Sequence, residues 1–152
     1  MPIKTFKGKI ASSDMQMINL HTNNGSTGYR IKKLELFPAS PGSTSYEIVF
    51  KVFKVSQVAN DYAGTNLFGI VDFSDQTLLA AAYLEGNNAN NATDGSNVVF
   101  DNEIFNQDIT ITSVDNDGNT EAVNYYIELE QVKLDLNENT VATLKNIRNI
   151  TG

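Results

Sequence analysis

The chain has 152 residues, of which 41% are apolar and 19% charged, and its formal net charge is −7. At this size a globular chain buries about 70% of its unfolded surface, so we expect one domain over residues 1–152. No cysteine is present, which excludes a disulfide framework and a thiolate metal site. An acidic chain without an arginine cluster argues against nucleic acid as a partner.

The charge is unevenly distributed along the sequence. Residues 1–54 carry eight Lys or Arg and three Asp or Glu, a net charge of +5, whereas residues 55–152 carry three and fifteen, a net charge of −12. Basic and acidic strands that pair across one sheet would account for this asymmetry. Alternatively, oppositely charged surfaces steer a partner or let copies associate head to tail.

The first residues, MPIKTFKGKIASSD, contain scattered charge and no apolar run of the length that a secretory signal needs. No later apolar run is long enough to span a membrane. We therefore expect a soluble protein that is made in a cytoplasm and has no membrane partner.

In the first third of the chain, alternating apolar residues predict strands at 3–10 and 15–21. The next predicted strand, 28–38, changes its apolar phase at Lys32–Lys33, which predicts a β-bulge there. Residues 45–55 have the clearest alternation, with Glu47 and Lys51 facing away from the core. The core-facing residues of this strand are Tyr46, Ile48, Phe50 and Val52.

The middle of the chain is less regular. Residues 67–73 (LFGIVDF) are apolar on both faces, as in a strand that is buried on both sides. Residues 74–78 predict a helical turn that leads into a strand. The asparagine-rich stretch 86–97 cannot bury anything and predicts an exposed loop. Further strands are expected at 98–105 and 107–114.

Residues 122–148 form the longest patterned stretch. Its first part predicts a long strand, and the apolar phase of that strand changes at Glu130–Gln131, which predicts a second bulge. A short C-terminal helix is expected at about 138–148, where Val141, Leu144 and Ile147 share one face. The sequence therefore predicts an all-β fold, an antiparallel, jelly-roll-like β-sandwich that ends in this helix.

Catalytic chemistry is not visible in the residues. His21 is the only histidine and no nucleophile elbow accompanies it. Glu128 and Glu130 lie two apart on one strand face, whereas a glycosidase pair is placed by separate elements around a cleft. We interpret them as outward residues that pair with Lys or Arg across the sheet. We expect no enzyme and no cofactor.

Four oxygen-bearing residues alternate in one turn: Asp115, Asp117, Asn119 and Glu121. Alternate oxygen ligands are typical of calcium loops. However, Thr120 and Tyr126 occupy the positions where a helix–loop–helix site needs Gly and Glu. A turn with solvated carboxylates is the favoured interpretation, and calcium binding stays open.

Residues 21–38, 72–85, 98–112 and 124–149 together make up about half of the chain. These four segments resemble small virion structural proteins of marine tailed bacteriophages. The resemblance implies a capsid decoration (cement) protein that is located in the virion, docks on the major capsid protein and stabilises the head. It also implies a homo-oligomer in the particle. A tail-tube, neck or head–tail adaptor component is the alternative within virions.

The lysine-rich first third then becomes the expected docking surface, because its charge suits an acidic partner. The docking residues are Lys4, Lys7, Lys9, Arg30, Lys32 and Lys33. The asparagine-rich loop 86–97 and the acidic remainder would face water. A glycan-binding β-sandwich module, contacting sugars through Tyr62 and amide-rich loops, is the alternative from another class.

Overall fold

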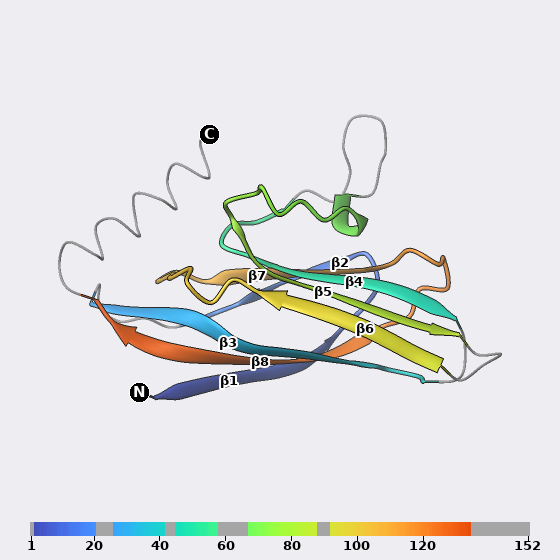
Figure 1. The fold of residues 1–152 in the computed structure, drawn as a ribbon, viewed down its shortest axis with the longest axis horizontal. Coiled ribbons are helices and arrows are strands. Elements are labelled where there is room, and N and C mark those ends of the chain that lie inside the picture. Colours follow the sequence, from blue (N-terminus) through green and yellow to red (C-terminus); the bar gives the residue numbers. More distant parts are fainter. Residues whose placement is uncertain (1, 21–25, 42–44, 58–66, 88–91, 135–152) are drawn as a thin grey trace.

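Two antiparallel sheets face each other in the computed structural model of this protein (Figure 1), which describes residues 2–20, 26–41, 45–57, 67–87 and 92–134. The eight strands of this described part are β1 (Ile3–Ile10), β2 (Asp14–Ile18), β3 (Thr27–Pro38), β4 (Tyr46–Phe53), β5 (Leu78–Asn87), β6 (Ala92–Val99), β7 (Ile109–Asp115) and β8 (Val123–Lys133). One 3-10 turn, η1 (Leu67–Gly69), is the single helical element there.

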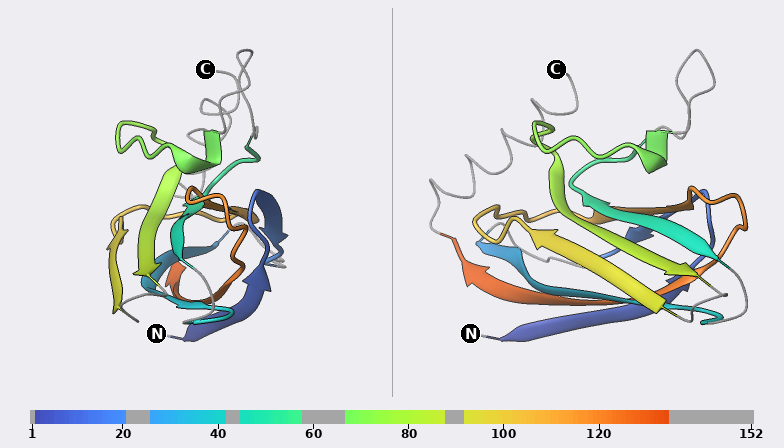
Figure 2. Two further views of the ribbon diagram at one scale, coloured as in Figure 1. Left: turned by 90° about the vertical axis from the view of Figure 1, so that its right-hand side faces the viewer. Right: turned by 45° about the vertical axis from the view of Figure 1, so that its right-hand side comes forward.

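The strand order defines a β-sandwich. One sheet has three strands in the order β1-β8-β3, and the other has five in the order β2-β7-β4-β5-β6. The end-on view in Figure 2 shows the two layers. The expectation of an antiparallel all-β sandwich is therefore confirmed, whereas the helix expected at 138–148 lies outside the described residues. No helix within the described ranges has the length and apolarity to cross a membrane.

Several strand pairs join segments that are distant in the sequence. Strand β1 pairs with β8 and β2 with β7, whereas β4 pairs with its successor β5. The turn at 115–119 carries the chain from one sheet to the other, because β7 and β8 belong to different sheets. Gly118 supplies the positive φ, 83°, that this turn requires.

Alternation within the strands fills the space between the sheets. The four core-facing residues predicted in β4 are all buried, which confirms that assignment. Strand β8 contributes Tyr125, Ile127 and Leu129 from the opposite sheet. The rings of Phe50 and Tyr125 lie 5.7 Å apart and join the two layers. One contiguous cluster of buried side chains therefore holds the sandwich together.

Only one of the two predicted bulges forms. The register of β3 against β8 shifts between Ile31 and Lys33, as the phase change predicts. The bulge expected at Glu130–Gln131 is wrong, because β8 pairs with β3 without interruption from Leu129 to Lys133. Pairing with β1 ends at Glu130, beyond which burial no longer alternates strictly. The apolar phase of β8 therefore changes where its pairing with β1 ends, and no extra residue is inserted in the ladder with β3.

The segment 68–77 covers part of the outer face of the five-stranded sheet. The expected doubly buried strand at 67–73 is wrong, since η1 is followed by exposed Ile70, Val71 and Phe73. Lys51 points away from the core as predicted, yet this segment buries it, and its Nζ donates to the Ile70 carbonyl. Burial lowers the pKa of Lys51, although Asp75 opposes the shift.

The expected helical turn at 74–78 is a pair of hydrogen-bonded turns before β5.

The exposed loop expected at 86–97 is mostly strand. Strand β5 continues to Asn87, β6 begins at Ala92, and Gly86 pairs with Thr93 across them. Only residues 88–91 of this stretch lie outside the described residues. Backbone pairing with β5 therefore outweighs the low strand propensity of a polar sequence. The strand expected at 98–105 ends at Val99, and Phe105 forms an isolated bridge with Tyr29.

The two sheets meet along a seam between β3 and β6. Near one end of the seam, Tyr29 and Phe105 exchange backbone hydrogen bonds of 2.7 and 2.9 Å. Further along, the Asn97 side chain donates to the Leu34 carbonyl at 2.6 Å. A side chain therefore occupies the β3 edge where a ladder bond to β6 would otherwise form.

Replacing Asn97 by Ala should weaken this seam. We expect Asn97→Ala to lower the free energy of unfolding by about 1 kcal/mol, because the Leu34 carbonyl loses its partner. Amide exchange along the β3 edge should accelerate at the same time. Urea denaturation and hydrogen exchange measure the two effects. Asn124→Ala, at an exposed position of β8, is the control, and equal effects of both variants would contradict the assigned role.

Candidate docking surface

The outer face of the three-stranded sheet presents a regular array of side chains. The antiparallel registers place outward residues in rows that run across β1, β8 and β3. These rows are Ile3–Glu130–Arg30, Thr5–Glu128–Lys33, Lys7–Tyr126–Glu35 and Lys9–Asn124–Phe37. Neighbours within a row lie about 5 Å apart, so each row acts as one contact unit. We call this array the outer face.

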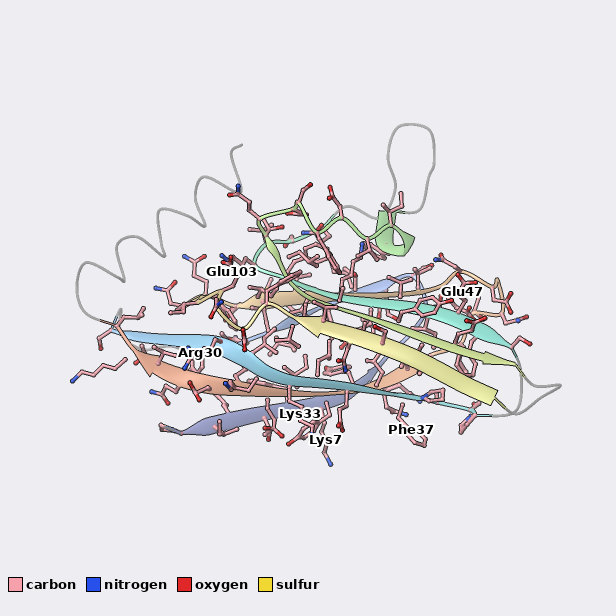
Figure 3. All side chains as sticks on the ribbon, viewed as in Figure 1. Lys7, Arg30, Lys33, Phe37, Glu47 and Glu103 are labelled. Carbon is pink, nitrogen blue, oxygen red and sulfur yellow. The ribbon has the colours of Figure 1, made fainter. Side chains whose placement is uncertain are left out.

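The outer face contains most of the predicted docking residues. Lys7, Lys9, Arg30 and Lys33 project from it, and Lys32 lies exposed at the adjacent bulge. In Figure 3 the side chains of Lys7, Lys33 and Phe37 all point away from the five-stranded sheet. The sequence pattern therefore identifies one real surface.

Lys4 does not belong to this surface. Its side chain lies on the inward side of β1, where Nζ donates to the Leu20 carbonyl at 2.9 Å. The same Nζ lies 5.8 Å from the ring centroids of both Phe6 and Tyr29, a cation–π arrangement. Lys4 thus closes one end of the core, and its assignment to the docking surface is corrected.

Cross-strand pairing neutralises part of the outer face. Arg30 Nε and Nη2 both donate to Glu130 Oε1, at 2.8 and 2.5 Å. These hydrogen bonds, with the positive charge of Arg30, hold the pKa of Glu130 below its ordinary value. Lys33 Nζ lies 3.4 Å from Glu35 Oε1, an exposed pair that contributes little. The prediction that Glu130 pairs across the sheet is confirmed.

The other end of the outer face keeps its positive charge. Within the described part of the chain, neither Lys7 nor Lys9 lies within ion-pair distance of a carboxylate. Phe37, in the same row as Lys9, is 64% exposed although it is a large apolar side chain. A shallow hollow of about 520 Å³ lies over these residues and Tyr126. Two unpaired cations beside an exposed ring form a candidate contact site.

The charge separates by sheet. Strands β1, β3 and β8 carry seven Lys or Arg and three Asp or Glu, a net charge of +4. All other described residues together carry two and twelve, a net charge of −10. The interpretation that basic and acidic strands pair across one sheet is supported, because β8, which carries Glu128 and Glu130, lies between β1 and β3 and Arg30 pairs with Glu130. The three-stranded sheet and the rest of the described chain still differ in the sign of their net charge.

Glu128 belongs to this array as well. It accepts a 2.9 Å hydrogen bond from the Tyr126 hydroxyl, and this bond raises the pKa of the Tyr126 phenol. Glu128 and Glu130 both lie on the open outer face of β8. His21 and Tyr62 lie outside the described residues.

The carboxylate of Asp115 organises the turn between the sheets. It accepts hydrogen bonds of 3.0 Å from the backbone N–H groups of Glu47, Asp117 and Glu121. Asp115 is only 5% exposed, so the expectation of a solvated carboxylate is wrong here. Glu121 is also buried and accepts from the Ser40 N–H. Among the described residues, no three His, Cys, Asp or Glu side chains are grouped to hold a metal ion.

Comparisons with known proteins do not assign this chain to a family. No family model matches the chain, and neither curated proteins nor solved structures yield a match.

Removing the Asp115 carboxylate should destabilise the protein without involvement of calcium. We expect Asp115→Ala to lower the free energy of unfolding by about 3 kcal/mol, because three backbone donors lose their acceptor. Calorimetry with added calcium or with a chelator should give the same melting temperature for the unmodified chain. Asp101→Ala, at an exposed turn, is the control. A calcium-dependent rise in melting temperature that Asp115→Ala abolishes would contradict a purely structural role.

Proposed function

We propose that this chain is a structural protein of a tailed bacteriophage virion, and within the virion a capsid decoration (cement) protein. Four segments that make up about half of its sequence resemble small virion proteins, and no catalytic role is part of the proposal. The observation that carries the docking role is the outer face, where Lys7 and Lys9 lack carboxylate partners among the described residues, beside exposed Phe37.

The fold supports this proposal. Pairing of β1 with β8, β2 with β7, and β4 with β5, with β3 and β6 meeting at a seam, is the arrangement of a jelly roll. Jelly rolls occur in viral capsid proteins and in lectins. We therefore infer a jelly roll here, which supplies a stiff scaffold for a flat contact surface.

The proposed mechanism is passive. Unpaired lysines attract an acidic surface of the major capsid protein over about 10 Å at moderate salt. Phe37 then loses its contact with water at the centre of the interface, which adds an apolar term to the binding energy. Copies that bind only the assembled shell stabilise it by mass action, and no covalent step is needed.

A glycan-binding module is a second candidate, favoured by the hollow on the same face. Besides Lys7 and Lys9, the hollow is lined by Phe37, Asn124 and Tyr126. Aromatic rings and an amide on an open sheet suit the apolar and hydroxyl faces of a sugar.

Salt should release the chain from virions if the proposed function is correct. We expect it to leave purified particles as salt rises while the heads stay intact, because exposed charge pairs are screened. Rebinding to stripped heads should weaken at least about tenfold for a Lys7→Glu/Lys9→Glu variant. Sedimentation with heads measures both effects. Lys133→Glu, at the far end of β8, is the control, and recovery of the chain with isolated tails would contradict a decoration role.

The glycan-binding candidate makes a separate prediction. If the hollow binds sugars, the isolated chain should bind saturably to members of a glycan array, and Phe37→Ser should abolish the signal because the ring platform is lost. Fluorescence or calorimetric titration with the best array sugar gives the affinity. Phe73→Ser, which removes an exposed ring elsewhere, is the control. Binding that both variants reduce equally would argue against this candidate.

A further inference from the structure

A second charged patch lies on the outer face of the five-stranded sheet, on the opposite side of the molecule. Glu47 on β4 is directly opposite Glu85 on β5 in the register. Like charges at facing positions destabilise a sheet. No Lys or Arg in the described ranges forms an ion pair with Glu47 or Glu85. The fold therefore keeps an uncompensated pair of carboxylates here.

An aromatic side chain completes this patch. Tyr83 lies two residues before Glu85 on β5, so both side chains are on the same face of the strand. Tyr83 is 36% exposed, and its hydroxyl donates to Glu85 Oε2 at 3.3 Å. Burial, and then the negative charges of Glu47 and Glu85, raise the pKa of the Tyr83 phenol, so it stays a neutral donor. We call Glu47, Tyr83 and Glu85 the acidic patch.

The basic end of the outer face has the complementary composition. We call Lys7, Lys9 and Phe37 the basic patch, which offers two cations and a ring against two carboxylates and a ring. The two lysines are two residues apart on β1, about 7 Å along the strand, and the two glutamates are about 5 Å apart across strands. Flexible lysine stems span this difference easily. Each patch therefore supplies the charge that the other lacks.

The two patches cannot meet within one molecule. The basic patch projects from the three-stranded sheet and the acidic patch from the five-stranded sheet, on opposite outer sides of the sandwich. In Figure 3, Lys7 and Phe37 lie below the lower sheet, whereas Glu47 lies on the upper one. A second copy brings the two patches together by placing its five-stranded sheet against the outer face of the first.

We infer that copies of this chain associate head to tail, with the basic patch of one copy bound to the acidic patch of the next. This inference rests on the proposed role of the outer face as a docking surface and names a partner for it. The contact is heterologous, so it does not close as a two-fold dimer would. One basic patch stays free at the end of each row of copies, where it can still reach an acidic shell.

The association should depend strongly on concentration and salt. Exposed charge pairs are individually weak, so copies bind each other loosely in solution. Sedimentation velocity of the purified full chain at about 20 mM salt should show species that grow with concentration, and at about 0.5 M salt only the monomer.

Charge reversal tests which patches are used. Lys7→Glu/Lys9→Glu and Glu47→Lys/Glu85→Lys should each sediment as a monomer at low salt, because each variant carries two patches of like sign. An equimolar mixture of the two variants should associate again, because one supplies acidic patches and the other basic ones. Circular dichroism confirms that each variant is folded. Lys133→Glu and Asp101→Lys are exposed single reversals that should leave self-association unchanged.

Three results would overturn the inference. The first is a chain that stays monomeric at low salt up to about 1 mM, a concentration at which even the weak contacts of exposed charge pairs should be detected. The second is a mixture of folded reversal variants that stays monomeric. The third is a control variant that disrupts association as strongly as the patch variants do. The proposed function is tested separately, because Glu47→Lys/Glu85→Lys keeps the basic patch and should still bind stripped heads. If the unmodified chain binds heads but does not self-associate, only the head-to-tail contact is refuted.

Discussion

Burial of one side of β8 is the constraint on which the rest of this structure depends. Strand β8 lies between β1 and β3, so every side chain that it turns inward must fill space above the five-stranded sheet. Ile127 and Leu129 are fully buried and Tyr125 stacks against Phe50 across the layers. Because side chains alternate, burying these residues necessarily directs Glu128 and Glu130 outward. The charges of the outer face are thus a direct result of core packing.

This origin explains why the outer face is only partly neutralised. The outward glutamates of β8 stand near the Arg30 and Lys33 end of the neighbouring strand, and Arg30 is paired there. Beside Lys7 and Lys9, β8 offers Tyr126 and Asn124 instead, so no described carboxylate lies within ion-pair distance of these lysines. The same sheet therefore has a neutral end and a charged end.

Strict alternation made part of the fold predictable from sequence. It identified the inward residues of β4 and the bulge in β3, because one face of each strand is fully buried. It failed at 67–73, where an apolar run lies on the outside of the sandwich and covers Lys51. Composition was misleading at 86–97, where pairing with β5 imposes a strand on a polar sequence. The local sequence pattern does not indicate which strand a segment pairs with, or which segment covers the outer face of a sheet.

The candidate site was predictable in kind but not in arrangement. Clustering of lysines in the first third indicated a basic surface, and four of the six residues project from one face. The inward direction of Lys4 depends on which phase of β1 is buried, and the apolar residues Ile3 and Phe6 point to opposite sides. That Phe37 joins Lys9 depends on the register of three strands far apart in sequence. The acidic patch likewise arises from register alone, since Glu47 and Glu85 are 38 residues apart.

The polar sequence of β6, ATDGSNVV, has a consequence for colloidal behaviour. Strand β6 ends the five-stranded sheet, and the edge strand of a sheet is the usual template for fusing sheets of separate molecules into cross-β aggregates. Glycine, serine, asparagine and a carboxylate in this strand have a low tendency to extend a ladder. The sequence of β6 therefore makes it a poor template for amyloid-like stacking.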